Sequence, residues 1–205
     1  MSTLLKSLKD FGQPHVGEKI IVCGCGTSLL SFAQIADQYT TIGVNDVPAL
    51  FTPTYLLVTD SPLRFIGKRK DIVMQSKCKY FFTCVSGWRH SNLVHFELGT
   101  RELSSLDKKN HLDHYLNSPY AAVCLAHRLG AKHIGLIGVD FTDGHFYNPK
   151  DGPHNIVKTR HLKKVNAAYQ KLRAELERRE VSLHNLNYAS NLEIPKITIE
   201  QFNQL

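Results

Sequence analysis

The stretch KIIVCGCGTSLL, residues 19–30, decides the predicted fold, because it joins a buried-strand pattern to the start of a helix. An apolar, β-branched run over residues 19–24 stops at the glycine turn of residues 24–26. Thr27 and Ser28 then supply the short hydroxyl side chains that favour a helix start. A strand, a tight glycine turn and a helix in succession are typical of nucleotide-binding α/β proteins.

Further stretches of the same kind predict the other strands of a sheet. They are residues 41–45, 54–60, 79–85, 133–140 and, with a weaker pattern, 181–187. Most are continuous apolar runs, as expected for parallel strands that are covered on both faces. Ser118 as N-cap and Gly130 as stop predict a helix between two of the strands, and an apolar stripe predicts a longer helix over residues 159–180. The predicted fold class is α/β, a Rossmann-like, mostly parallel sheet with helices on both faces.

Length and composition fit a single folded unit. The chain has 205 residues, of which 42% are hydrophobic, and this predicts one domain over residues 1–205 with an N-terminal extension at residues 1–18. No apolar run approaches the roughly 20 residues that span a bilayer, and the first residues lack a secretory-signal pattern, so a cytoplasmic location is expected. The five cysteines complete no zinc motif, which predicts reduced thiols and no metal site.

The chain is basic. Its formal net charge is +7, from 25 Lys and Arg against 18 Asp and Glu, and part of the excess is clustered at residues 67–71 and 158–164. Such an excess favours polyanionic partners, namely nucleic acid, nucleotide phosphates or an anionic membrane. Net charge alone does not choose among these partners.

Several predicted strands end in polar residues that form a candidate binding site. Asn45, Asp60 and Asp140 end three of them, and ligands of open α/β sheets bind beyond the carboxyl ends of the strands. The glycines of the first turn allow a ligand to approach the backbone, and the helix start at Thr27 and Ser28 favours phosphate. The turn is not a standard phosphate loop, because the third glycine of G-x-G-x-x-G is absent.

Four segments in a fixed order resemble a known family. They are VCGCGTSL, GVNDVP, SPYAAVCLAHRLGAKHIGLIGVDF and VSLHNLNYASNL, with a long basic helix before the last. In this order they are similar to the bacterial sialyltransferases that use CMP-sialic acid, and to a wider sialyltransferase-like set that includes hydroxymethylpterin pyrophosphokinases. The match runs from about residue 19 to about residue 195, and residues 62–115 match poorly.

The resemblance implies roles for individual residues. The glycine turn would lie against the phosphate and ribose of the nucleotide, with Asn45 and Ser118 in the same pocket. Tyr147 would support the departing phosphate, and His161 would be the general base, with His154 as the substitute. The predicted catalytic residues are therefore His161, Tyr147 and Asp140. The predicted nucleotide-binding residues are Gly24, Cys25, Gly26, Thr27, Ser28, Asn45, Asp60 and Ser118.

Departures from the family pattern bear on the donor, and one of them is Pro119, which follows Ser118 where the transferases have a glycine. Cys25 stands where the transferases have an asparagine, and Thr142 stands where a second tyrosine is expected. The nucleotide sugar is therefore left open between CMP-linked and UDP-linked donors. We expect a glycosyltransferase that moves a sugar from such a donor to an acceptor hydroxyl, with no cofactor required.

Two other functions remain open at this stage. With Asp140 and Asp143, Asp60 could assemble a Mg²⁺ site for a pyrophosphokinase-like enzyme that uses ATP. The polar groups lost at Cys25 and Thr142 would instead suit a nucleotide-binding module without turnover.

The acceptor is open as well. The basic clusters suggest a modified nucleic-acid base as the acceptor, and Trp88 could stack on a base or sugar, although burial in the core is the commoner fate of a lone tryptophan. The resemblance also suggests a homo-oligomer.

Overall fold

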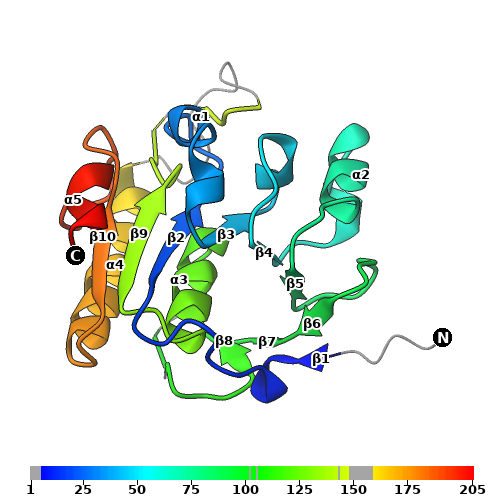
Figure 1. Cartoon of the computed structure of the whole chain (residues 1–205), viewed down its shortest axis with the longest axis horizontal. Coiled ribbons are helices and arrows are strands. Elements are labelled where there is room, and N and C mark those ends of the chain that lie inside the picture. The colour runs from blue at the N-terminus through cyan, green and yellow to red at the C-terminus, as the bar shows by residue number, and fades with distance from the viewer. Residues whose placement is uncertain (1–5, 102, 105, 143, 148–158) are drawn as a thin grey trace.

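The computed structural model describes residues 6–101, 103–104, 106–142, 144–147 and 159–205. An eight-stranded sheet, all of whose neighbouring strands are parallel, forms its centre (Figure 1). The strand order is β1-β6-β5-β4-β3-β2-β9-β10. The strands are β1 (Lys6–Ser7), β2 (Lys19–Cys23), β3 (Thr41–Val44), β4 (Tyr55–Val58), β5 (Tyr80–Thr83), β6 (Leu93–His95), β9 (His133–Ile137) and β10 (Ser182–Asn185). Strands β7 (Glu97–Leu98) and β8 (His111–Leu112) form a small separate ladder.

The direction in which the chain builds the sheet changes next to β2. From β2 the chain adds β3, β4, β5 and β6 on one side, and it then returns to place β9 and β10 on the other side. Cys23 at the end of β2 pairs with Ile137 at the end of β9, so the two strands stop at the same level. The predicted α/β class is confirmed, and the reversal defines where a ligand site is expected.

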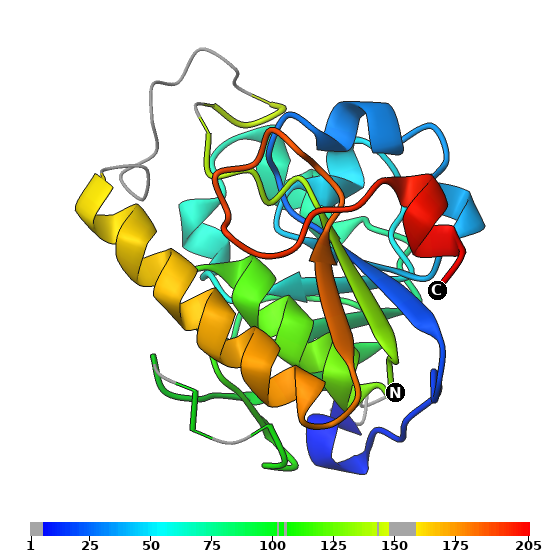
Figure 2. The ribbon, with the colours of Figure 1, turned by 90° about the vertical axis from the view of Figure 1, so that its left-hand side faces the viewer.

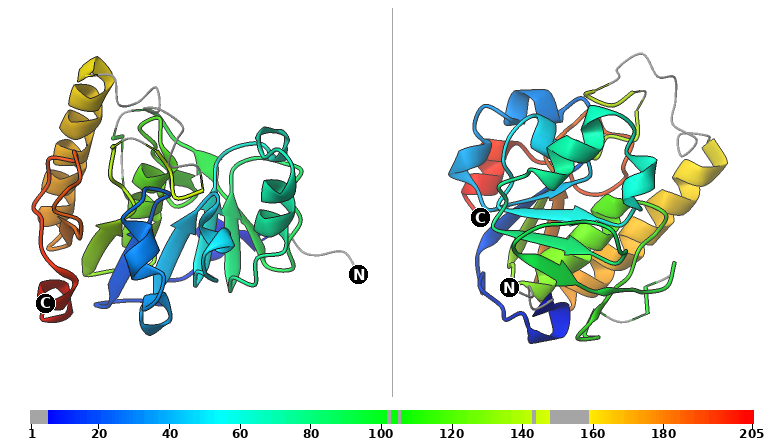
Figure 3. Two further views of the ribbon diagram at one scale, coloured as in Figure 1. Left: turned by 90° about the horizontal axis from the view of Figure 1, so that it is seen from above. Right: turned by 90° about the vertical axis from the view of Figure 1, so that its right-hand side faces the viewer.

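Helices cover both faces of the sheet. They are α1 (Leu29–Phe32), α2 (Lys68–Met74), α3 (Ser118–Arg128), α4 (Thr159–Glu177) and α5 (Ile199–Asn203). Short 3₁₀ turns are η1 (Leu8–Asp10), η2 (Ala36–Gln38), η3 (Val47–Ala49) and η4 (Pro62–Arg64). Helices α3 and α4 lie on one face, and α1 and α5 lie on the other (Figure 2). Helix α2 lies at the opposite end of the sheet from α4 and α5 (Figure 3).

At β4 the core is divided between two clusters, because successive residues of a strand point to opposite faces of the sheet. Tyr55 and Leu57 of β4 belong to the large cluster under α3, whereas Leu56 and Val58 belong to a smaller cluster on the other face. Trp88 lies in the smaller cluster, and only 4% of its surface is exposed. The suggestion that Trp88 stacks on a base or sugar is therefore wrong, and the indole N–H donates to the carbonyl of Asp60 over 2.9 Å.

The sequence placed one helix start a residue too late. The N-cap of α3 is Asn117, whose side chain accepts from the backbone N–H of Tyr120, and Ser118 is the first helical residue. Gly130 ends the helix at φ +96°, as predicted. Within the described residues, none of the helices is both long and apolar enough to cross a bilayer.

Two glycines let the ends of β2 and β9 touch. The Gly24 N–H donates to the Ile137 carbonyl over 2.8 Å, and a Cβ at Gly24 would lie 2.3 Å from the carbonyl oxygen of Gly138. A Cβ at Gly138 would lie 2.5 Å from the carbonyl oxygen of Gly24. The contact is backbone against backbone, so no side-chain movement relieves it.

We expect Gly24→Ala to lower the free energy of unfolding by about 2 kcal/mol or more, because the new methyl group must push the two strand ends apart. Gly12→Ala is the matched control, since a Cβ at Gly12 meets nothing within 4 Å. Urea unfolding of the two variants measures the difference. Equal stability of the two variants would contradict the close approach.

Candidate functional site

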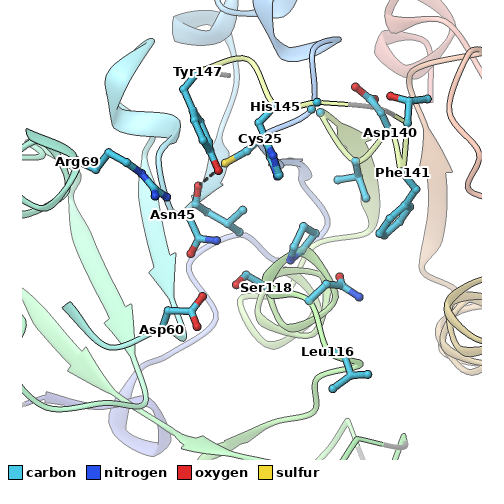
Figure 4. Close-up of a pocket in the computed structure, with 18 of the residues that line it drawn as sticks. Cys25, Asn45, Asp60, Arg69, Leu116, Ser118, Asp140, Phe141, His145 and Tyr147 are labelled. Carbon is cyan, nitrogen blue, oxygen red and sulfur yellow. Dashed lines mark hydrogen bonds between the residues drawn. The ribbon is translucent and has the colours of Figure 1, made fainter. Parts of the chain in front are cut away.

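A cavity of about 350 Å³ opens at the carboxyl edge of the sheet, beside the reversal between β2 and β9 (Figure 4). Its walls come from the segments that follow β2, β3, β4 and β9, and from the start of α3. The predicted site residues that line it are Cys25, Gly26, Asn45, Asp60, Ser118, Asp140 and Tyr147. Segments that are far apart in the sequence therefore meet at one place, as the strand-end argument predicted.

The carboxylate of Asp140 is fixed inside the protein. Asp140 is 3% exposed, and it accepts from the backbone N–H of Ser28 over 2.9 Å and from the Ser28 hydroxyl over 2.6 Å. Asn187 donates to the same carboxylate over 2.8 Å. The Ser28 hydroxyl in turn accepts from the Gly138 N–H over 2.9 Å. Asp140 thus ties the loop after β2 to the segments after β9 and β10.

This network shows what the glycine turn holds. A Cβ at Gly26 would lie 2.3 Å from Oδ2 of Asp140, so the turn is shaped to fit over that carboxylate. The Ser28 amide, which the sequence assigned to a ligand phosphate, donates to Asp140 instead. Gly24, Thr27 and Ser28 do not line the cavity within the described part of the chain.

Asn45 is the most unusual residue of the cavity wall. Its backbone has φ +50°, a left-handed conformation that side-chain-bearing residues rarely adopt. Its buried Oδ1 has no hydrogen-bond partner among the residues that the structure describes. Leu116 and Phe141, which also line the cavity, have φ +56° and +50°. Strained backbone of this kind gathers at functional sites, where it costs of order 1–3 kcal/mol per residue.

Cys25 replaces the polar residue expected at the cavity wall, and it is not reactive. Its Sγ lies 3.5 Å from the carbonyl of Val44, and only 8% of the residue is exposed. Burial raises the pKa of the thiol to about 12, and the charge of Asp46 adds to the rise. The thiol is therefore protonated at neutral pH and does not act as a nucleophile.

Arg69 is a site residue that the sequence did not identify. It extends from α2 to the cavity, and its Nε and Nη2 donate to the buried carboxylate of Asp46 over 2.7 and 2.6 Å. The guanidinium also lies over the rings of Phe65 and Tyr147, at 5.1 and 4.9 Å from their centroids. The cluster GKRKD was a signal of positive charge, but nothing in the pattern distinguished Arg69 from its neighbours.

Asp60 and Ser118, two further polar residues of the wall, have partners as well. Asp60 pairs with Arg64 over 3.0 Å, and Ser118 shares a 2.9 Å hydrogen bond with Thr59. Among the described residues, no three His, Cys, Asp or Glu side chains are grouped in a way that could hold a metal ion. Asp143, which the sequence placed with Asp60 and Asp140 in a Mg²⁺ site, lies outside the described residues.

The predicted bases and the tyrosine are placed differently. His161 is exposed in the first turn of α4 and is not one of the described residues that line the cavity, and His154 lies outside the described residues. His145, to which the sequence assigned no role, does line the cavity. Its ring stacks on that of Tyr147 with centroids 5.0 Å apart (Figure 4). An imidazole in the loop after a strand has no sequence pattern that would mark it as a cavity residue.

Comparison with solved structures confirms the fold. The MAf glycosyltransferase of Magnetospirillum magneticum matches with a TM-score of 0.61 and 12% sequence identity, over 98% of this chain and 36% of its own. The sialyltransferase CST-II, in complex with a trisaccharide acceptor and CMP, matches with a TM-score of 0.49 and 14% identity, over 84% of this chain and 82% of its own. The sialyltransferase Cst-I of Campylobacter jejuni matches with a TM-score of 0.48 and 15% identity, over 93% and 80%.

These likenesses are at the level of structure. No protein-family model and no curated protein matches the sequence. The chain spans about one third of the length of the MAf glycosyltransferase, with 36% of that protein covered. The likeness to the MAf glycosyltransferase, at a TM-score of 0.61, therefore confirms the predicted α/β fold.

The carboxylate of Asp140 accepts hydrogen bonds from three donors of Ser28 and Asn187. Asp140→Asn replaces one of its oxygens with an NH₂ group, which cannot accept a hydrogen bond and faces these donors with two N–H groups of its own. We expect it to lower the free energy of unfolding by about 3 kcal/mol. The same substitution at exposed Asp37, in η2, is the matched control and should change stability little. Thermal unfolding measures both, and an equal effect at the two positions would contradict the role of Asp140.

Proposed function

We propose that the cavity binds the nucleotide part of a nucleotide-sugar donor, and that the protein transfers the sugar to an acceptor hydroxyl. The observation that carries this proposal is Asn45. A buried amide oxygen without a partner and a left-handed backbone both cost free energy. Nucleobases and riboses carry N–H and O–H donors, and a ligand that draws the amide oxygen of Asn45 toward the cavity would offset part of that cost.

The fold supports the same conclusion. It is the fold of the MAf glycosyltransferase, and the cavity lies where open α/β sheets bind ligands. The bacterial enzymes that the sequence resembles take CMP-linked donors, and CST-II has been solved in complex with CMP. We therefore propose a CMP-linked or UDP-linked donor, with no metal required for the transfer.

Among the described residues of the wall, we assign Arg69 to the donor's phosphate. Arg69 is held by Asp46 and by two aromatic rings, so its guanidinium is oriented before a ligand arrives. Nη1 is the nitrogen that Asp46 does not engage, and we assign it to a phosphate oxygen. Orientation before binding reduces the entropy lost when the contact forms.

The proposed reaction is a displacement at the anomeric carbon of the donor sugar. The acceptor oxygen forms a bond to that carbon, and the bond from the carbon to the phosphate oxygen breaks. The acceptor proton passes to a base, and the nucleotide leaves with the bonding electrons. Tyr147 would donate a hydrogen bond to the leaving phosphate, which stabilises the charge that develops there.

His145 is the base that the geometry favours. It is the one imidazole among the described residues that line the cavity, and an imidazole titrates near neutral pH. His161, the base implied by the sequence resemblance, would have to reach the acceptor from the first turn of α4. The first turn of α4 lies at the same end of the molecule as the carboxyl edge of the sheet (Figure 2). His145 and His161 are therefore tested as alternative bases.

Asn45→Gly separates ligand binding from fold stability, because glycine adopts φ +50° without strain. We expect the variant to fold at least as stably as the wild type and to bind nucleotide about tenfold more weakly. A nucleotide at 100 times its dissociation constant adds about 2.7 kcal/mol of stability, and a tenfold loss of affinity halves this to about 1.4 kcal/mol.

The measurement is a thermal-shift titration with CMP, with UDP and with ATP, each with and without Mg²⁺. Glu180→Gly is the matched control, since Glu180 has φ +58° but lies at the far end of α4. Stabilisation by CMP or UDP that Asn45→Gly weakens and Glu180→Gly does not supports the proposal. Stabilisation only by ATP with Mg²⁺ would favour pyrophosphoryl transfer, and no shift with any nucleotide would favour a protein without a nucleotide site.

His145→Gln should lower turnover by about two orders of magnitude and leave nucleotide binding unchanged, because a general base contributes roughly 10²–10⁴ to the rate. His161→Gln is the comparison variant and should retain turnover. Release of CMP or UDP from a panel of nucleotide sugars and acceptors provides the measurement. The opposite result, loss at His161 and retention at His145, would place the base on α4.

A further inference from the structure

The segment between β4 and α2 carries an unusual pair of side chains. Leu63 is 89% exposed and Ile66 is 81% exposed, and these are the two most exposed large hydrophobic residues in the described part of the chain. Between them Phe65 is 5% exposed, and Pro62 is also buried. Single exposed apolar residues are ordinary, but two neighbouring aliphatic side chains almost fully in water point to a partner.

The segment is held in place and is not a loose loop. Phe65 packs edge-on against Trp88 with centroids 5.0 Å apart, and the N–H of Leu63 donates to the hydroxyl of Ser61 over 3.3 Å. Because the buried residues Pro62 and Phe65 each directly precede an exposed residue, Leu63 and Ile66 are presented outward by a chain that is anchored beside them.

Two lysines follow Ile66 in the sequence. Lys68 and Lys70 form no ion pair with any residue that the structure describes, whereas Arg64 is paired with Asp60 and Arg69 with Asp46. We call residues 61–70 the tip. The tip therefore combines two exposed aliphatic side chains with two unpaired ammonium groups within eight residues, Leu63 to Lys70.

The tip is also the rim of the cavity. Arg64, Phe65 and Arg69 line the cavity on one side of the chain, while Leu63 and Ile66 are exposed. Whatever surface the tip contacts will consequently lie beside the mouth of the candidate active site.

We propose that the tip docks on an anionic lipid surface. Aliphatic side chains that enter the acyl boundary are removed from water, and lysines beside them are attracted by lipid phosphates. A nucleic acid would use the lysines but would leave the aliphatic side chains in water, since these do not stack on bases. Together the two features match a membrane surface better than a nucleic acid.

Docking in this way has a consequence for the acceptor. This consequence rests on the proposed function: if the protein transfers a sugar, the acceptor hydroxyl belongs to a molecule held at the lipid surface. The docking itself does not depend on turnover, so the two are tested separately.

The experiment is co-sedimentation of the full chain with vesicles of equimolar phosphatidylcholine and phosphatidylglycerol, and with vesicles of pure phosphatidylcholine. We expect binding to the anionic vesicles that weakens with salt. Leu63→Gln with Ile66→Gln should lower the partition coefficient roughly tenfold or more. Lys68→Gln with Lys70→Gln should lower it about fivefold per lysine on anionic vesicles only.

Matched controls lie at the opposite edge of the sheet. Val16→Gln with Leu205→Gln removes two other exposed aliphatic side chains, 70% and 49% exposed. Val16 is next to Gly17, whose N–H donates to the carbonyl of Gly130 just before β9 begins. Leu205 is two residues after Asn203, whose carbonyl accepts from Lys19 at the start of β2. Both control positions are therefore near the amino ends of the strands. Lys77→Gln with Lys79→Gln removes two exposed charges outside the tip. The control pairs should leave vesicle binding within twofold of wild type.

Several outcomes would overturn the docking proposal. The first two are absence of binding to anionic vesicles at low salt, and equal losses of vesicle binding in the tip and control variants. The other two are binding of an oligonucleotide, but not of vesicles, that depends on the tip, and a dimer that depends on the tip and does not bind vesicles. Emission of Trp88, the single tryptophan, reports whether the tip remains folded in each variant. Thermal shift with CMP or UDP on the same variants separates the claims, since nucleotide binding without vesicle binding would reject docking and leave the proposed function standing.

Discussion

The site depends on the hydrogen bonds that the buried carboxylate of Asp140 accepts. It accepts three hydrogen bonds from Ser28 and Asn187, and it lies directly under Gly26. The three strands β2, β9 and β10 are thereby tied together just beyond their carboxyl ends. A parallel sheet fixes where its strands end but leaves the following loops free to diverge, and this carboxylate removes that freedom at the point where the direction of building reverses.

The cavity between those loops is lined by residues whose conformation or burial lowers the stability of the fold. Asn45, Leu116 and Phe141 have left-handed backbones, and the amide oxygen of Asn45 is buried without a partner among the described residues. A packed core would not retain such features, because each lowers the stability of the fold. Their concentration around one cavity is the physical reason for regarding it as the functional site.

Charge is distributed differently inside the cavity and around it. The two arginines of the wall, Arg64 and Arg69, are paired with Asp60 and Asp46, so much of the charge at the cavity wall is balanced within the protein. Lys68 and Lys70, which form no ion pair with any described residue, lie outside it on the rim. The net charge of +7 is therefore expressed more on the surface around the cavity than on its wall.

The α/β class, the six longer strands, the two long helices and the edge of the sheet where Asn45, Asp60 and Asp140 meet follow from the sequence alone, because apolar periodicity and strand ends are local signals. The partners and the burial of these groups depend on the tertiary structure. It turned the glycine turn toward Asp140, buried Trp88, and brought in Arg69 and His145 from segments without a motif. Hydrogen-bond partners and burial depend on residues distant in sequence, and no local pattern contains them.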